Sequence, residues 1–266
     1  NPDDVTVALA EAWHRAGINR VSLGVQSFEE KVLRYLGRRH DANSARRACE
    51  IVGNRFDTWS LDLIFGAPPV KAWAATLDEA VAIGPPHLSA YNLTYEVGTP
   101  FEKRADQAIP DDIALQMFRE AEERLVGFDH YEISNYAKPG HQSRHNLIYW
   151  RNEDYAGFGT GAYSYIDGVR ARNAVTTDEY LRNPGGKTEA EAIDDDATRL
   201  ETLIQHFRLE VGMEKNYYQQ RFGHPVEDDY GAVLSALYDR GLLTQDETRI
   251  WPTHDLNNEI GLALIQ

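Results

Sequence analysis

Three apolar runs of strand length alternate with amphipathic segments in the first hundred residues, and this alternation restricts the fold more than any other feature. The runs are Arg20–Ser27, Thr58–Gly66 and His87–Glu96. Between them, small and apolar residues recur three and four positions apart in Glu29–Tyr35, Asn43–Val52 and Trp73–Ile83. Strands separated by helices form a parallel sheet through right-handed crossovers. The pattern predicts an α/β fold, either an open sheet or part of a barrel, with ligands at the carboxyl ends of the strands.

The remainder of the large domain is predicted to contain one more helix and one more strand. Pro110 and Asp111 are helix-initiating residues, so we expect a helix over Ile113–Val126. A fourth strand is expected near Tyr131–Ser134. After the Gly185–Gly186 turn the pattern becomes helical. We therefore place the boundary between about 184 and 195, with a large domain over residues 1–190 and a small one over 191–266.

The small domain is predicted to be winged-helix-like, because helices precede a short hairpin. Its expected elements are the helices Ala197–Val211, Tyr217–Phe222 and Asp229–Arg240, the strand Thr248–Pro252 and a last helix near Asn257.

Charge and composition restrict the partners. The net charge of -15 repels a phosphate backbone, so we expect no nucleic-acid binding. No run approaches the ~18 apolar residues of a membrane span, so we expect no integral membrane segment. Cys49 is the single cysteine, which excludes a disulfide framework and a cysteine-only metal site within the chain, and favours the cytoplasm. The chain opens on Asn1 without an initiator Met, so we expect the true start to lie upstream.

Polar side chains interrupt each apolar run: Gln26 in the first, Asp62 in the second and Asn92 in the third. Burying such a group without a partner costs about 1–3 kcal/mol. Backbone could satisfy any one of them, but three at equivalent strand positions favour a ligand. Asp62, near the end of its run, could accept hydrogen bonds from a ribose diol, and Gln26 could do the same from the neighbouring strand. A nucleoside-like ligand across the strand ends is therefore predicted.

Arg38 and Arg39 follow Gly37 in a short loop, where a guanidinium could hold a ligand carboxylate in bidentate geometry. Exposed surface arginine is the alternative.

The segment from Tyr131 to Trp150, YEISNYAKPGHQSRHNLIYW, combines aromatic, imidazole and amide side chains. His145 could ligate a haem iron or a divalent metal, with Tyr149 and Trp150 as a flat apolar wall. The alternative is a hydrogen-bonded core histidine. The glycines of Gly157–Ala162 permit a close approach of backbone to a ligand, which alone is a weak signal.

These motifs occur in the order found in another group of proteins. The runs GVQSF, LDLIFG, HLSAYNLTYEVGTPF, YEISNYAKPGHQSRHNLIYW and GFGTGAYSY resemble the HemN/HemW family of radical-SAM proteins along essentially the whole chain. The resemblance implies a partial (β/α)6 barrel that holds a [4Fe-4S] cluster and S-adenosylmethionine at its strand ends, and a small C-terminal domain.

The resemblance also implies roles for individual residues. Gln26 and Asp62 match S-adenosylmethionine contacts, Arg38 matches the arginine that binds the carboxylate, and Tyr163 matches a further contact with this cofactor. The HNxxYW pattern is similar to the haem-binding motif of the family's haem-chaperone branch, and it assigns haem binding to His145, Asn146, Tyr149 and Trp150, with His145 as the iron ligand. The implied partners are haem-accepting proteins, and a homodimer is left open.

The sequence departs from the family pattern at its start. The family's CxxxCxxC motif, the glycine-rich strand after it and a glutamate before Asn-Pro would all lie upstream of Asn1. We therefore expect a fragment that lacks about half of the barrel and the cluster ligands. Two alternatives to a haem chaperone are an oxygen-independent coproporphyrinogen III dehydrogenase and an inactive remnant.

Overall fold

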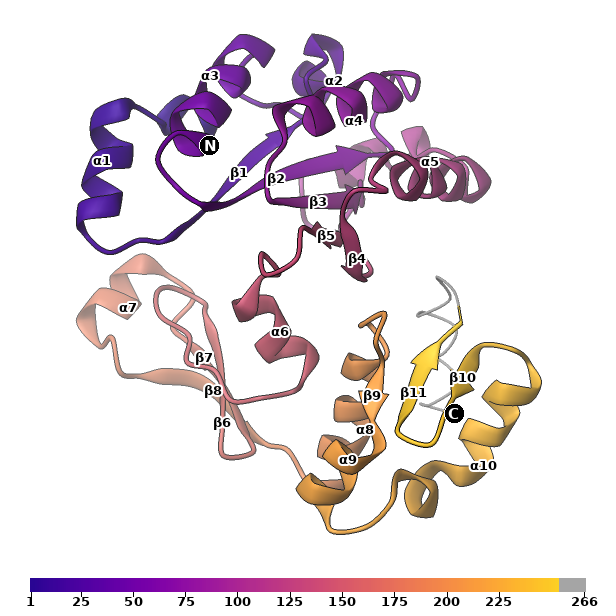
Figure 1. The fold of residues 1–266 in the computed structure, drawn as a ribbon. Helices are drawn as coiled ribbons and strands as arrows, with labels where there is room; N and C mark the ends of the chain where they lie inside the picture. The colour runs from indigo at the N-terminus through magenta and orange to yellow at the C-terminus, as the bar shows by residue number, and fades with distance from the viewer. Residues whose placement is uncertain (254–266) are drawn as a thin grey trace. The chain divides into compact units, whose positions relative to one another are not determined.

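The computed structural model of the protein describes residues 1–253 and separates into two compact units (Figure 1). The first unit spans residues 1–142 and the second begins at Ser143. This division falls earlier than the domain boundary predicted between 184 and 195, and the boundary after residue 190 stays a prediction. The units are described separately below.

The first unit is built on an open five-stranded sheet in the order β1-β2-β3-β5-β4. The parallel strands are β1 (Arg20–Gln26), β2 (Thr58–Phe65) and β3 (His87–Asn92), which confirms the three predicted strands, although the third ends four residues before Glu96. The predicted fourth strand is one arm of an antiparallel hairpin, β4 (Asp129–Glu132) and β5 (Asn135–Ala137). Because β1 pairs only with β2 among residues 1–253, the sheet does not close within the described part of the chain, as expected for part of a barrel.

The crossovers between these strands are helical, as the periodicity predicts. The predicted helices are α2 (Glu30–Tyr35), α3 (Ala42–Gly53), α4 (Ala72–Ile83) and α5 (Asp111–Arg124). The sequence analysis did not predict α1 (Val7–Arg15), which precedes β1, or the short 3-10 helices η1 (Pro2–Asp4) and η2 (Glu102–Gln107). Local chemistry sets their ends. The Asp41 carboxylate accepts from the Ser44 backbone N–H at 2.7 Å and so caps α3, and Gly84 ends α4 in the left-handed conformation (φ 72°).

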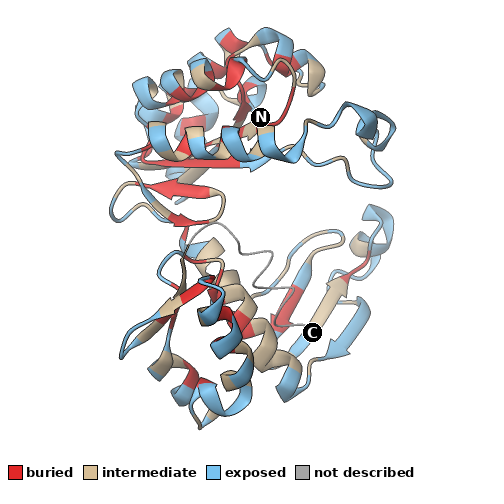
Figure 2. Cartoon of the chain, turned by 90° about the vertical axis from the view of Figure 1, so that its right-hand side faces the viewer, coloured by how far each residue is buried: buried red, intermediate tan, exposed pale blue. Residues whose placement is uncertain are grey.

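The two faces of the parallel strands differ in chemistry. One face carries Leu23, Val25, Leu61, Leu63 and Leu88, each at most 1% exposed, which pack in one core with Val52 of α3 and Leu77 of α4. The other face, which we call the inner face, carries Ser22, Ser60, Asp62, His87 and Ser89. In Figure 2 the strands are largely buried while the outer turns of the helices are exposed. A polar inner face beside an apolar helix-covered face is the pattern of a barrel wall whose interior holds ligand.

The second unit opens with helix α6 (Arg144–Trp150) and an antiparallel meander of β6 (Tyr163–Ile166), β7 (Val169–Asn173) and β8 (Lys187–Ala192), with α7 (Thr177–Arg182) between the last two. The sequence analysis missed this sheet. All six residues of β8 are exposed and its sequence KTEAEA has no apolar alternation, so periodicity gives no strand signal there.

The C-terminal part confirms the winged-helix-like prediction. It contains α8 (Asp195–His206), α9 (Lys215–Phe222) and α10 (Val226–Asp239), and a sheet of β9 (Met213–Glu214), β10 (Leu243–Gln245) and β11 (Arg249–Pro252). Leu203, Phe207 and Ile250 form part of its core. The predicted helix to Val211 is wrong beyond His206, because turns begin at the C-cap Phe207, where the Leu209 N–H bonds the His206 carbonyl oxygen. The chain then passes Gly212 (φ 59°), where a Cβ would lie 2.0 Å from the Ile250 carbonyl oxygen. The helix predicted near Asn257 lies outside the described residues.

Within residues 1–253, no helix has the length and apolar character needed to cross a membrane.

Candidate functional site

Gln26 and Arg38 meet above Gly24 on the inner face of β1. A Cβ at Gly24 would lie 2.8 Å from Gln26 Nε2 and 3.1 Å from Arg38 Nη2, so any larger residue would displace these two side chains from their positions. Arg38, in the loop after α2, donates from Nη2 to the Gly24 carbonyl oxygen at 2.9 Å and to Asn1 Oδ1 at 2.8 Å. The structure therefore brings Gln26 and Arg38 together, and Arg38 is half-buried rather than a freely exposed surface arginine.

Gln26 is held in a strained and under-satisfied state. It is 9% exposed, its φ of 68° lies in the left-handed region that side chains disfavour, and a bulge separates it from Leu23 in the pairing with β2. Its Oε1 is buried and has no hydrogen-bond partner within the part of the chain that the structure describes. Such strain and an unpaired buried acceptor are typical of binding sites, where a ligand donor completes the bonding.

The Arg38 guanidinium supplies the positive charge of this region. Burial, followed by the neighbouring charge of Arg39, lowers the pKa of Arg38, which stays protonated as arginines do. Arg39 itself is exposed and pairs with Asp4 at 3.3 Å, so the structure separates the two adjacent arginines. The strand-end region thus combines a cation with an unused acceptor, a pairing that suits a zwitterionic amino-acid group.

Asp62 lies in the middle of β2 rather than near its end, which corrects the sequence analysis. Its Oδ2 accepts from Ser22 Oγ at 2.6 Å, and its Oδ1 accepts from Ser60 Oγ at 3.2 Å and Ser89 Oγ at 3.1 Å. An ionised carboxylate offers about four acceptor positions. Ser22 and Ser60 occupy two of these positions. Ser89 has one hydroxyl hydrogen, which it shares between Asp62 Oδ1 and the nearer Asn135 Oδ1 (2.7 Å), so at least one position remains for a ligand hydroxyl.

Gln26, Asp62 and Asn92 do not occupy equivalent positions in their strands, so the expectation of three equivalent polar residues is wrong. The register aligns Gln26 with Leu63, Asp62 with Ser89, and Asn92 with Phe65. Asn92 is exposed and has the parity of Leu88 and Ala90, the helix-covered side of β3, so it needs no buried partner.

Tyr163, the remaining predicted cofactor contact, begins β6 in the second unit. It is 43% exposed, and the Arg172 guanidinium carbon lies 5.3 Å from its ring centroid. Its role toward the cofactor stays a prediction.

His145 projects from the first turn of α6 and is exposed, which removes the alternative of a core histidine. Ser143 caps the helix by accepting from the Asn146 N–H at 3.4 Å. His145 and Tyr149 are four residues apart and share one helix face, with His145 Nε2 and the Tyr149 hydroxyl 2.9 Å apart. Tyr149 in turn meets the Tyr155 ring edge-on at a centroid distance of 4.6 Å. The predicted imidazole and aromatic wall therefore lie together.

Trp150 has a different environment from Tyr149. The guanidinium carbon of Arg208 lies 4.4 Å from its ring centroid, and its Nε1 is buried. One face of the indole is therefore covered by the protein, although Trp150 as a whole is half-buried like Asn146 and Tyr149. The predicted contact of Trp150 with haem stays a prediction.

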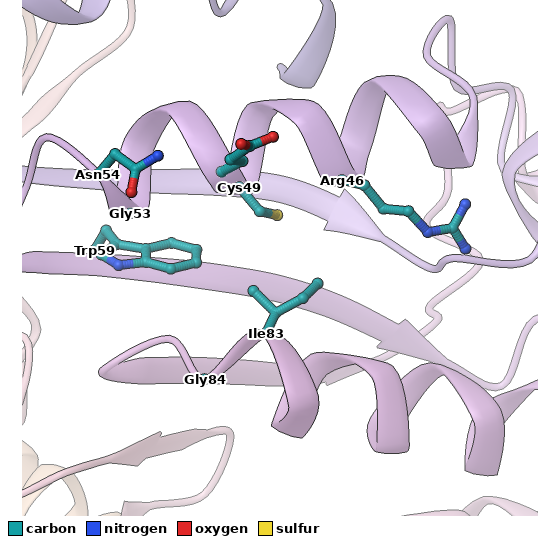
Figure 3. A pocket seen from close by; sticks show the side chains of 8 residues that line it. Arg46, Cys49, Gly53, Asn54, Trp59, Ile83 and Gly84 are labelled. Carbon is teal, nitrogen blue, oxygen red and sulfur yellow. The ribbon is translucent and has the colours of Figure 1, made fainter.

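Cys49 provides no metal site. It lines a surface hollow of about 410 Å³ between α3 and α4, where Figure 3 places it near Trp59 and Ile83. Burial raises the pKa of its thiol to about 12, which keeps it protonated. Among residues 1–253, no group of three His, Cys, Asp or Glu side chains is arranged to hold a metal ion. The residues present therefore do not fit an iron–sulfur cluster.

Comparison with known proteins identifies relatives along the whole chain. Residues 193–254 match the model of the HemN C-terminal domain. Heme chaperone HemW of Bacillus subtilis is 32% identical over 98% of this chain and 73% of the relative. Heme chaperone HemW of Synechocystis is 40% identical over 76% of this chain, and that of Escherichia coli is 41% identical over 70%.

The chain spans about half the length of two of these relatives. The matched part spans 53% of the Synechocystis relative and 50% of the Escherichia coli one. The solved structure of the coproporphyrinogen III oxidase HemN from Escherichia coli, a radical SAM enzyme, has a TM-score of 0.83 and covers 99% of this chain and 68% of that chain. At 19% identity, that similarity shows the fold alone.

Proposed function

This chain belongs to the heme chaperone HemW family of radical-SAM proteins, and from that membership we propose that the complete protein binds haem and delivers it to haem-accepting proteins. The observation that carries the proposal is the HNLIYW motif on α6, which exposes an imidazole beside a tyrosine ring. An exposed histidine can ligate haem iron without unfolding a core, and an aromatic ring beside it can pack on the porphyrin. His145 is the proposed iron ligand, and Asn146, Tyr149 and Trp150 the proposed surrounding residues.

Exposure of this site suits transfer rather than permanent storage. A deep pocket buries most of a ligand and slows its release. His145, on a surface helix turn, would let a bound haem remain open to an acceptor protein. When iron binds Nε2, the Tyr149 hydroxyl must release that nitrogen, so its 2.9 Å contact acts as a competing partner.

Gln26 and Arg38 around Gly24, together with Asp62 on the same inner face, form what we call the strand-end site, and we propose that it binds S-adenosylmethionine. Arg38 would hold the carboxylate, the buried Gln26 Oε1 would accept from a donor of the cofactor, and Asp62 would accept one hydroxyl; Tyr163 is proposed as a further contact. The Gly24 cradle and the unpaired Gln26 oxygen support this assignment. S-adenosylmethionine would supply an adenosyl group activated by its sulfonium. Ligands for a [4Fe-4S] cluster would have to come from outside residues 1–253.

Coproporphyrinogen III dehydrogenation is the weaker candidate. The HemW relatives reach 32% identity over 98% of the chain, whereas the HemN structure reaches 19%.

Titration of haem into the full-length, cluster-reconstituted protein tests the chaperone proposal. The Soret band of the wild type should saturate, and His145→Ala should weaken binding by 100-fold or more, an order expected for losing an iron ligand (about 3 kcal/mol or more). Because His145 is exposed, the variant should keep its stability within ~0.5 kcal/mol.

His14→Ala serves as the matched control, since His14 is also exposed on a helix. It should bind haem like the wild type. Equal binding by the His145→Ala variant, or no saturable binding by any of the three proteins, would contradict the proposal and favour the dehydrogenase.

A further inference from the structure

A hydrogen-bond chain runs along the inner face of the first unit from Tyr131 to Asp62. The Tyr131 hydroxyl lies 2.9 Å from His87 Nε2, and His87 Nδ1 lies 2.9 Å from Ser60 Oγ. Ser60 Oγ then donates to Asp62 Oδ1 at 3.2 Å. Ser60 and His87 are 1% exposed and Tyr131 is 4% exposed, so solvent does not replace these contacts.

The Asp62 carboxylate fixes the direction of every donor in this chain. Ser60 has one hydroxyl hydrogen, and a carboxylate only accepts, so that hydrogen is directed at Asp62. Ser60 must then accept from His87, which places the imidazole hydrogen on Nδ1. The bare Nε2 in turn accepts from the Tyr131 hydroxyl. A single tautomer of His87 satisfies all three contacts.

His87 is neutral, as this arrangement requires. Burial, together with the nearby charge of Arg20 and His141, lowers the pKa of His87 to about 3. The imidazole therefore donates through one nitrogen and accepts through the other at physiological pH.

A second arm reaches Asp62 from the β4–β5 hairpin. Ser89 Oγ lies 3.1 Å from Asp62 Oδ1 and 2.7 Å from Asn135 Oδ1, and its one hydroxyl hydrogen is shared between these two acceptors. Asn135 Nδ2 donates to the Glu132 carboxylate. Glu132 and Asn135 are both 2% exposed. Glu132 and Asn135 of the YEISN segment thus connect the hairpin with Ser89 beside Asp62, and Tyr131 belongs to the first chain.

We propose that His87 is a positioning residue for Asp62: through Ser60 it fixes the carboxylate so that an acceptor position stays available to a ligand hydroxyl. This inference rests on the proposed binding of S-adenosylmethionine at Asp62, but the positioning itself is a property of the ligand-free protein. His87 lies outside the contacts of the cofactor site, and its effect passes through Ser60.

The test reads the Asp62 carboxylate directly by ¹³C NMR of its Cγ in the full-length, ligand-free protein, with the signal assigned by Asp62→Asn. Losing a donor to the ionised form raises the titration midpoint. Ser60→Ala should raise the titration midpoint of Asp62 by about 1 pH unit, as expected for the loss of one hydrogen bond to a charge. His87→Ala should also raise it, and His87→Asn, which keeps an N–H near the Nδ1 position, should restore most of the shift.

Ser27→Ala is the matched control, because Ser27 is 2% exposed and bonds Thr76 at 3.0 Å instead of Asp62. Its midpoint should equal that of the wild type. The charged and titratable groups that interact with Asp62, Arg20 and Tyr91, are unchanged in the His87 variants, as are the three serines.

Unchanged midpoints in Ser60→Ala and His87→Ala, or equal midpoints in His87→Ala and His87→Asn, would overturn the proposal. Equilibrium dialysis with S-adenosylmethionine on the reconstituted proteins separates it from the proposed function. If the Asp62 midpoint shifts in the variants but the protein takes up no S-adenosylmethionine, the positioning of Asp62 by His87 stands and the proposed cofactor binding is refuted.

Discussion

Substituting Gly24 with alanine should disable the strand-end site while leaving the fold intact. The added Cβ would lie 2.8 Å from Gln26 Nε2, so this amide has to retreat by about 0.6 Å to reach ordinary contact at 3.4 Å. The Arg38 Nη2 atom, at 3.1 Å, also has to move, which weakens its 2.9 Å bond to the Gly24 carbonyl. Both affected atoms are ends of flexible side chains, so the backbone of β1 need not shift.

The displacement translates into a loss of affinity. Misplacing Gln26 or Arg38 removes about one hydrogen bond to a charged ligand, which is worth about 1.5–3 kcal/mol. At 1.4 kcal/mol per factor of ten, S-adenosylmethionine should bind about 10–100-fold more weakly. Gly24 has no left-handed φ, and alanine restricts the unfolded chain, so the free energy of unfolding should change by less than about 1 kcal/mol.

Isothermal titration of S-adenosylmethionine into the reconstituted full-length protein measures the affinity, and urea unfolding measures the stability. Gly127→Ala is the control, because a Cβ there meets no atom within 4 Å. Wild-type affinity in the Gly24→Ala variant would refute the placement of the cofactor over Gly24. A large loss of stability would instead show that the backbone had moved.

Two further predictions concern stability in the second unit. Burial lowers the pKa of His206 to about 4, below its ordinary 6.5, despite its 2.8 Å bond to the Thr202 carbonyl. As pH falls, His206 is therefore protonated in the unfolded chain before it is protonated in the folded protein. Its contribution to the free energy of unfolding is present above pH 6.5 and is lost as pH falls toward 4. Urea unfolding at pH 7 and pH 5 should show a smaller loss on acidification in His206→Asn than in the wild type; equal losses would contradict this. Leu203→Ala, at a fully buried position, should cost about 2–5 kcal/mol in unfolding free energy, whereas Leu181→Ala, at a position 68% exposed, should cost less than ~0.5 kcal/mol. Similar costs for the two leucines would refute the assignment of the C-terminal core.

Local sequence patterns were sufficient for much of the architecture. The three parallel strands and their crossover helices follow from apolar periods of two and 3.6, which depend on neighbours within a few residues. The winged-helix-like end follows in the same way. The β6–β8 meander was missed because its exposed edge strand has no such period.

The sequence by itself also determined which residue types could meet ligands: an arginine and a glutamine beside the first strand, an aspartate in the second, and the HNLIYW motif. Tertiary structure alone decided their arrangement. Strand register aligns Asp62 with Ser89 on the inner face and places Asn92 on the other, helix-covered face of β3. A bulge in β1, with a left-handed φ at Gln26, brings the Gln26 side chain over Gly24. His87 follows Ser60 by 27 residues and Tyr131 follows His87 by 44, yet the three side chains form one hydrogen-bond chain. Pairing register and long-range contact depend on the packing of the whole sheet, which no local period encodes.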